Sequence, residues 1–164
     1  HCSAVGENFG GHPYAAGLSM NVENVERFTA MVEEYVSTHI DPTQTKANLD
    51  IDAEISFMEI NHKFFNDLKR MRPFGPDNPK PIFCTRQVYD YGTSKVVGKD
   101  QEHIKLELVD SNASQVMHGI AFGQSSQARY IKSKHAFDIA YTLEDNTYKK
   151  GEIQLQIVDI NTRN

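Results

Sequence analysis

Two glycines followed by a histidine stand near the start of the chain, within NFGGHPYAAGLSM at residues 8–20. Paired glycines can bring backbone N–H groups close to a phosphate, and the neighbouring imidazole can offer a hydrogen bond or a positive charge to the same oxygen. The alanine-rich residues that follow indicate a short helical turn. Gly10, Gly11 and His12 are therefore candidate phosphate ligands. The alternative is an ordinary glycine turn beside a surface or capping histidine.

Basic and aromatic side chains recur between residues 86 and 150. Proteins bind single-stranded nucleic acid where positive charges follow the backbone and aromatic rings stack on the bases. The alternative for each tyrosine is a place in the core or at the rim of a β-barrel, and for each lysine a solvated surface. The tentative ligands of single-stranded DNA are Arg86, Tyr89, Lys95, Lys99, Lys105, Arg129, Lys132 and Lys149, chosen from a wider set that also holds Tyr91, Tyr130, Lys134, Tyr148 and Lys150.

Potential metal ligands are spread thinly along the chain. The seven histidines, at positions 1, 12, 39, 62, 103, 118 and 135, show neither HxH nor HxxxH spacing. Asp50, Asp52 and Glu54 form an acidic run without a nearby histidine, which indicates a solvated strand edge rather than a cation site. Cys2 and Cys84 have no CxxC partner, which indicates neither a disulfide framework nor structural zinc. The sequence predicts no metal site and a reducing cytoplasm.

The secondary structure that must position these residues is predicted to be mainly helical in the first part of the chain and mainly β-strand in the second. Apolar residues from Val22 to His39 repeat at three and four residues after an N-cap at Asn21, which predicts an amphipathic helix. Alternation over 49–55 predicts a strand, and Asn61 opens a short helix. Residues 72–81 hold four of the six prolines and can sustain neither helix nor central strand. We therefore place a domain boundary at Gly75, between domains 1–75 and 76–164.

The second part has the period-two pattern of β-strands. Apolar runs occupy 82–91, 95–97, 104–109, 116–122, 136–143 and 153–160, whereas 124–134 has few β-formers and predicts a short helix. This order suits a small antiparallel, five-stranded Greek-key barrel of the OB type better than a sandwich, which the pattern alone leaves open. The predicted fold class is α+β.

Composition excludes several classes of protein. The 164 residues are 39% hydrophobic and 24% charged, which is ordinary for a globular protein. No apolar run reaches the roughly 18 to 20 residues that a membrane span needs. Residues 1–75 carry six Lys/Arg and 11 Asp/Glu, against 11 of each in 76–164. Any polyanion must therefore bind locally and weakly, with an affinity that falls as salt rises.

Five motifs resemble those of one family and follow the same order. GGH at 10–12 with AAGL at 15–18 resembles the GGH-x-x-AAG-L motif of the DHHA1 domain in DHH-type phosphoesterases. PFGPDNPKPIF at 73–83 is similar to the PFGPGNPEPVF stretch that joins DHHA1 to the OB domain in the bacterial RecJ family. Further matches are IDAE at 51–54, VGKD with HIKL at 97–106, and AFG at 121–123. Together they cover nearly the whole chain.

The resemblance implies that residues 1–75 are the end of a DHHA1 α/β domain and residues 76–164 an OB domain. The parent would be a single-stranded-DNA-specific exonuclease that degrades DNA 5′ to 3′, with Mg or Mn, in repair and recombination. The family's metal ligands lie in an N-terminal DHH domain, and no Asp-His-His occurs here. We therefore expect an inactive fragment of a longer protein, in which Gly10, Gly11 and His12 hold the substrate phosphate.

Two other functions stay open at this point. The β domain could be a non-catalytic interaction module that docks a repair factor such as a single-strand-binding protein. The glycine motif alone would also suit a small-nucleotide phosphodiesterase of the same superfamily, although that function leaves the β domain without a purpose. Single-stranded DNA is the partner that accounts for both halves of the chain.

Overall fold

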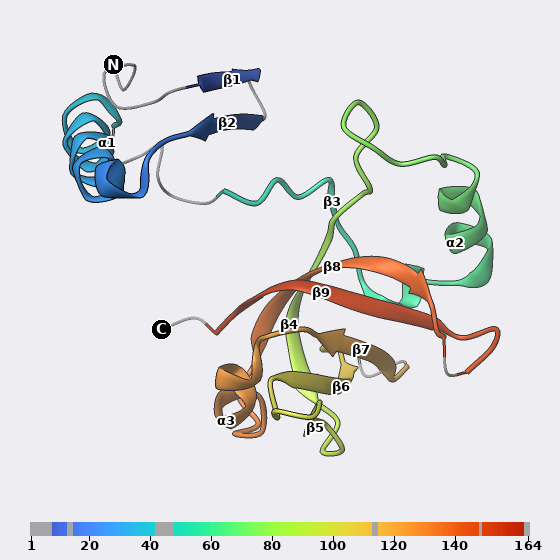
Figure 1. Ribbon diagram of the computed structural model, residues 1–164. Helices are drawn as coiled ribbons and strands as arrows, with labels where there is room; N and C mark the ends of the chain where they lie inside the picture. Colours follow the sequence, from blue (N-terminus) through green and yellow to red (C-terminus); the bar gives the residue numbers. More distant parts are fainter. Residues whose placement is uncertain (1–7, 13–14, 42–47, 113–114, 148, 163–164) are drawn as a thin grey trace. The chain divides into compact units, whose positions relative to one another are not determined.

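The computed structural model in Figure 1 describes residues 8–12, 15–41, 48–112, 115–147 and 149–162. The chain divides into two units, residues 1–49 and 50–164. Residues 50–75, which the sequence places in the first domain, belong to the second unit because Phe57, Ile60 and Phe65 join its hydrophobic core. The proline-rich joint at Gly75 therefore lies inside the second unit.

The first unit is a β-hairpin and a helix. Strands β1 (Asn8–His12) and β2 (Ala15–Ser19) pair antiparallel, and α1 (Val25–His39) follows a single 3₁₀ turn at Val22–Asn24. The Asn21 side chain accepts the N–H of Glu23 at 3.4 Å, so the predicted cap opens this turn and the predicted helix is confirmed. None of the residues of α1 is buried within this unit.

The predicted helical turn after the glycines is wrong, because these residues form strand β2. Gly11 lies opposite Ala16 in the hairpin, and a Cβ on Gly11 would stand only 2.8 Å from the Ala16 Cβ. The missing side chain thus lets the two strands approach each other. Cross-strand pairing decides the conformation here, over the helix propensity of alanine.

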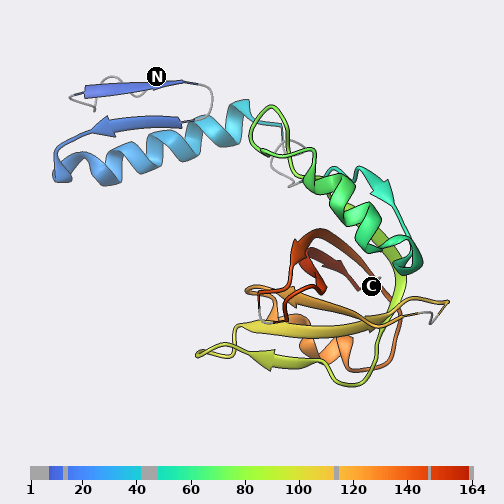
Figure 2. The ribbon, with the colours of Figure 1, turned by 90° about the vertical axis from the view of Figure 1, so that its right-hand side faces the viewer.

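Five strands of the second unit close into a barrel: β4 (Phe83–Asp90), β6 (His103–Val109), β7 (Met117–Ala121), β8 (Phe137–Asp145) and β9 (Ile153–Asn161). The pairings run β4–β8, β8–β9, β9–β7, β7–β6 and β6–β4, and of these β7–β9 is parallel. Strand β5 (Lys95–Val97) adds to β6, and β3 (Ala53–Glu54) adds to β4. Figure 2 shows the strands curving around the core. The predicted small five-stranded barrel is confirmed.

Strand alternation fills the barrel as predicted. Ile104, Leu106 and Leu108 of β6 are fully buried, and Tyr141 of β8 is buried beside them in the same core. The Thr85 hydroxyl donates to the Ile55 carbonyl at 2.7 Å and therefore accepts from the Tyr141 hydroxyl, also at 2.7 Å. Burial raises the pKa of Tyr141, which keeps this donor protonated. The predicted short helix is α3 (Ala128–Ile131), between β7 and β8.

The segment before the barrel packs onto it through α2 (His62–Lys69). The Asn61 side chain accepts the N–H of Phe64 at 2.9 Å, as expected of an N-cap, and Phe65 is buried. The proline-rich loop that follows turns back at residues 75–78. There the Asn78 side-chain amide donates to the carbonyls of Met71 and Pro73, both at 2.9 Å. The loop is therefore held by hydrogen bonds as well as by its prolines.

Asp110, at the end of β6, joins this segment to the barrel. It is 3% exposed and accepts the N–H of Phe57 at 2.9 Å and that of Asn112 at 3.2 Å. Gln115 donates to the Phe57 carbonyl from the same side. One buried carboxylate thus satisfies two backbone donors on different segments.

Replacing Asp110 by Ala leaves those two N–H groups without acceptors. A buried unsatisfied donor costs about 1–3 kcal/mol, so we expect Asp110→Ala to lower the free energy of unfolding by that amount in urea denaturation. Asp159→Ala is the control, because Asp159 is exposed on β9. Equal midpoints for the two variants would contradict a joining role for Asp110.

The β5–β6 turn contains a residue in the left-handed region. Gln101 has φ 56°, a conformation that glycine adopts without steric cost. We expect Gln101→Gly to raise the free energy of unfolding by about 0.5–1 kcal/mol, whereas Gln101→Ala gains nothing because its Cβ keeps the strain. Thermal denaturation of the two variants checks this, and a destabilised glycine variant would refute it.

Candidate nucleic-acid interface

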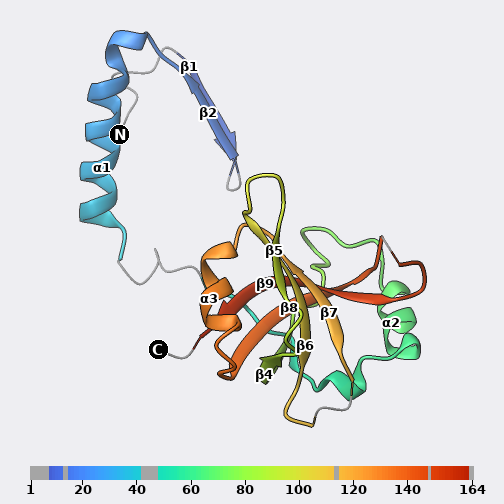
Figure 3. The same ribbon diagram turned by 90° about the horizontal axis from the view of Figure 1, so that it is seen from below.

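The outer face of β5, β6, β7 and β9 carries a groove. On β6 the inward positions are Ile104, Leu106 and Leu108, so His103, Lys105 and Glu107 face outward. The register places Lys105 opposite Ile120 of β7. Figure 3 shows these strands from a second direction. The groove is lined by Val97, Gly98, His103, Lys105, His118, Ile120, Phe122, Glu144, Asp145, Asn146, Thr147, Lys149, Gln154 and Gln156.

An exposed aromatic ring stands in this groove. Phe122 is 54% exposed and lies edge-on to the His103 ring, with ring centroids 5.0 Å apart. The Gly123 amide donates to His103 Nδ1 at 3.0 Å. Because an amide can only donate, Nδ1 carries no proton and the neutral ring is protonated on Nε2, which faces Glu102 at 3.2 Å. His103 is thereby held in place and supports Phe122 as a stacking surface.

Two lysines of the β5–β6 hairpin lie side by side. Lys95 is directly opposite Lys105 in the antiparallel register, and both are exposed. Like charges in opposite positions repel each other and destabilise a hairpin. An anion between the two ammonium groups would remove that repulsion. The pair is therefore a suitable phosphate contact beside the groove.

The carboxylates that line the groove, Glu144 and Asp145, are paired with lysines. Glu144 pairs with Lys80, and Asp145 pairs with Lys69 at 2.6 Å. Paired carboxylates repel a polyanion less than free ones do. The groove can therefore accept negative charge although its lining contains acidic residues.

The structure places two of the eight residues predicted as DNA ligands in the groove lining and two more next to lining residues. Lys105 and Lys149 line the groove, Lys95 is opposite Lys105, and Lys99 follows the groove residue Gly98 in the β5–β6 turn. The other four neither line the groove nor adjoin a lining residue in register or sequence. Tyr89 is half-buried in β4, Arg129 and Lys132 are exposed on and beside α3, and Arg86 pairs with Glu54 at 2.6 Å.

The groove also contains residues that the sequence did not single out: Phe122, His103, His118, Gln154 and Gln156. The sequence pattern could have indicated some of these residues. Strand alternation predicts that residues between the buried positions of β6 and β9 face outward. Phe122 ends an apolar run, however, and apolar runs indicate core. Only the pairing of β7 with both β6 and β9 places that ring over the groove.

The glycine motif lies in the other unit. Gly10 pairs with Gly17, and His12 is exposed at the end of β1. A Cβ at Gly10 would meet nothing within 4 Å, so the backbone there is open on one side. Among the described residues, no three His, Cys, Asp or Glu side chains converge in a way that could hold a metal ion. Cys2 lies outside the described residues.

No helix in the described part of the chain is both long and apolar enough to cross a bilayer. The five-stranded closed barrel, with its parallel β7–β9 pair and the helix between β7 and β8, defines an OB-fold domain.

The family follows from comparison with known proteins. The RecJ OB domain matches residues 51–159, and the DHHA1 domain matches residues 1–38. The chain therefore belongs to the RecJ family, as its motifs indicated.

Named relatives agree with this assignment. The single-stranded-DNA-specific exonuclease RecJ of Salmonella typhimurium is 27% identical over 92% of this chain, and that of Escherichia coli is 26% identical over 92%. In each case the match covers 25% of the relative, so the chain spans about a quarter of their length. The crystal structure of RecJ from Thermus thermophilus with Mn²⁺ has a TM-score of 0.70 at 21% identity, covering 96% of this chain and 22% of that one. The fold is therefore shared.

Proposed function

We propose that the barrel binds single-stranded DNA along the groove on the outer face of β5, β6, β7 and β9. The observation that carries the proposal is the exposed Phe122 ring, supported by His103, with Lys95 and Lys105 on the same sheet. Bases stack on such a ring while lysines contact the backbone, and this combination tolerates any base sequence. The relatives' names, which specify single-stranded DNA, support the same ligand.

We also propose the role of this chain in its parent protein. The chain would guide the strand in a single-strand-specific exonuclease that works 5′ to 3′ in DNA repair and recombination. Hydrolysis in such an enzyme needs a divalent metal, Mg or Mn, that activates water and polarises phosphate. The described residues do not fit that metal, because they contain no cluster of ligands. We therefore assign cleavage to a part of the parent protein outside this chain. This chain alone would not cleave DNA.

Gly10, Gly11 and His12 are the proposed phosphate contact of the first unit. The backbone at Gly10 has open space on one side, and His12 is exposed beside it. A phosphate could therefore approach the backbone there as well as the imidazole. This contact would hold the scissile nucleotide, whereas the barrel would hold another part of the strand.

His12→Ala tests this contact in the full-length parent. We expect nuclease activity on single strands to fall about 100-fold, as when one stabilising donor is removed from other active sites, with an unchanged melting temperature. His39→Ala is the control, because His39 is an exposed histidine at the end of α1. Near-normal activity of the His12 variant would remove the assignment.

Phe122→Ala tests the groove in this chain. Loss of one stacked base costs roughly 1–3 kcal/mol, so affinity for a labelled single strand should fall about 5- to 100-fold in a gel-shift or anisotropy titration, while Phe122→Tyr binds normally. Tyr91→Ala is the matched control, since Tyr91 is a 59% exposed aromatic residue outside the groove lining. Equal affinities of the two alanine variants would contradict this role, and failure of the unmodified chain to bind single strands would favour a protein partner.

A further inference from the structure

We propose that the strand-binding surface extends past the barrel onto a cationic rim formed by Lys69, Arg72 and Lys80, where Arg72 contacts a backbone phosphate. This inference rests on the function proposed above. Lys69 is the last residue of α2, and Arg72 and Lys80 lie between α2 and β4, so the rim is outside the five barrel strands. It would lengthen the bound strand beyond the groove itself.

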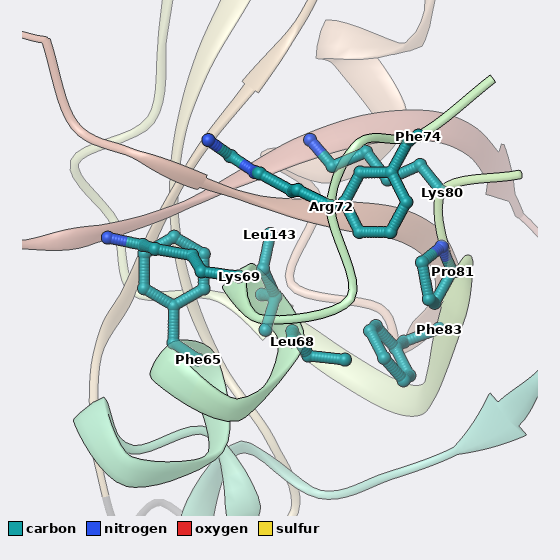
Figure 4. Close-up of a pocket in the computed structure, with 9 residues that line it drawn as sticks. All are labelled: Phe65, Leu68, Lys69, Arg72, Phe74, Lys80, Pro81, Phe83 and Leu143. Atoms are coloured by element: carbon teal, nitrogen blue, oxygen red, sulfur yellow. The ribbon is translucent and has the colours of Figure 1, made fainter. Parts of the chain in front are cut away.

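The rim surrounds a small hollow between α2, the proline-rich loop and the end of the barrel (Figure 4). The floor is apolar and includes Phe65, Phe83 and Leu143. In Figure 4 the charged ends of the three basic side chains point away from Phe83 and Pro81. The three charged groups therefore do not point into the hollow.

Ion pairs join the rim to the groove. Lys80 pairs with Glu144, and Lys69 pairs with Asp145 at 2.6 Å. Glu144 and Asp145 are the residues that line the groove where β8 ends. A strand that leaves the groove across the end of β8 therefore meets these lysines next. The two sites are adjacent because the same carboxylates border both of them.

Arg72 supplies the surplus charge of the rim. Within the described residues, Lys69 and Lys80 each have a carboxylate partner, whereas no carboxylate lies within 4.0 Å of the exposed Arg72 guanidinium. Lys69 is further held over the Phe65 ring, with Nζ 4.2 Å from its centroid. A guanidinium can bind one phosphate through two parallel hydrogen bonds. The cluster thus carries one net positive charge, and its geometry suits a phosphate.

Burial of the floor favours a phosphate backbone over an acidic peptide. A peptide anchored there would need apolar surface for its own side chains. Phe65, Phe83 and Leu143 are only 4%, 5% and 3% exposed, because they belong to the barrel core. The hollow therefore offers charge at its rim but little apolar area to a partner.

The test compares Arg72→Ala with Arg70→Ala across strands of increasing length, from about 4 to about 16 nucleotides. Arg70 is the matched control, because it has the same charge two residues away and is 84% exposed, with Asp67 at 3.7 Å. We expect Arg72→Ala to weaken binding of the longer strands several-fold at low salt and to reduce the slope of log affinity against log salt by about 0.7, the value for one phosphate on a single strand. The shortest strands and the Arg70 variant should bind as the unmodified chain does.

Several results would overturn the proposed phosphate contact at Arg72. Equal losses at all lengths, equal losses for both arginine variants, or no loss at all would overturn it. An Arg72 variant that loses an acidic peptide such as polyglutamate but keeps long strands would overturn it in favour of a protein ligand. Phe122→Ala, measured alongside, separates the two proposals. If Phe122→Ala weakens the binding of short strands while Arg72→Ala changes no affinity, binding in the groove is supported and its extension onto the rim is refuted. If Phe122→Ala changes no affinity, binding in the groove is itself refuted.

Discussion

Closure of the barrel depends on a bulge in β4, and the rest of the second unit depends on that closure. The β4–β8 register shifts between Thr85 and Val88, after which Tyr89 and Asp90 pair with β6 instead. Gln87, inside the bulge, has φ 54°, and its N–H is bound at 2.9 Å by the buried Asp138 carboxylate. One side chain thus replaces the ladder partner that the bulge removes, which lets a single strand belong to both edges of the sheet.

The bulge also explains why Arg86 lies outside the groove. Its guanidinium reaches Glu54 at 2.6 Å and Asp138 at 3.9 Å, so it sits over the carboxylate that holds the bulge and ties β3 to β4. Arg86 is therefore paired with carboxylates that hold β3 and β4 together. The exposed lysine pair beside the groove lies elsewhere, where β5 extends β6 and places Lys95 opposite Lys105.

Ion pairs between the barrel and the preceding segment reduce the negative charge of the groove. Two carboxylates at the groove are matched by lysines from the segment that precedes the barrel, so the acidic lining is neutralised where it borders the site. That segment is held against the barrel by Asp110 and by buried side chains of α2. Its position therefore affects the charge of the groove as well as the stability of the unit.

The sequence by itself determined the local features: the caps at Asn21 and Asn61, the alternation of β6, the proline-rich joint and the order of strands and helices within the second unit. These depend on residues within a few positions of each other, so the spacing of side chains is enough to reveal them. Tertiary structure alone decided that residues 15–19 pair as a strand with β1, that residues 50–75 belong with the barrel, and that Phe122 meets His103 over a groove. Each of these depends on contacts between separate segments, with the Lys80–Glu144 pair spanning 64 residues, and no local pattern encodes which outward-facing side chains such pairing will bring together.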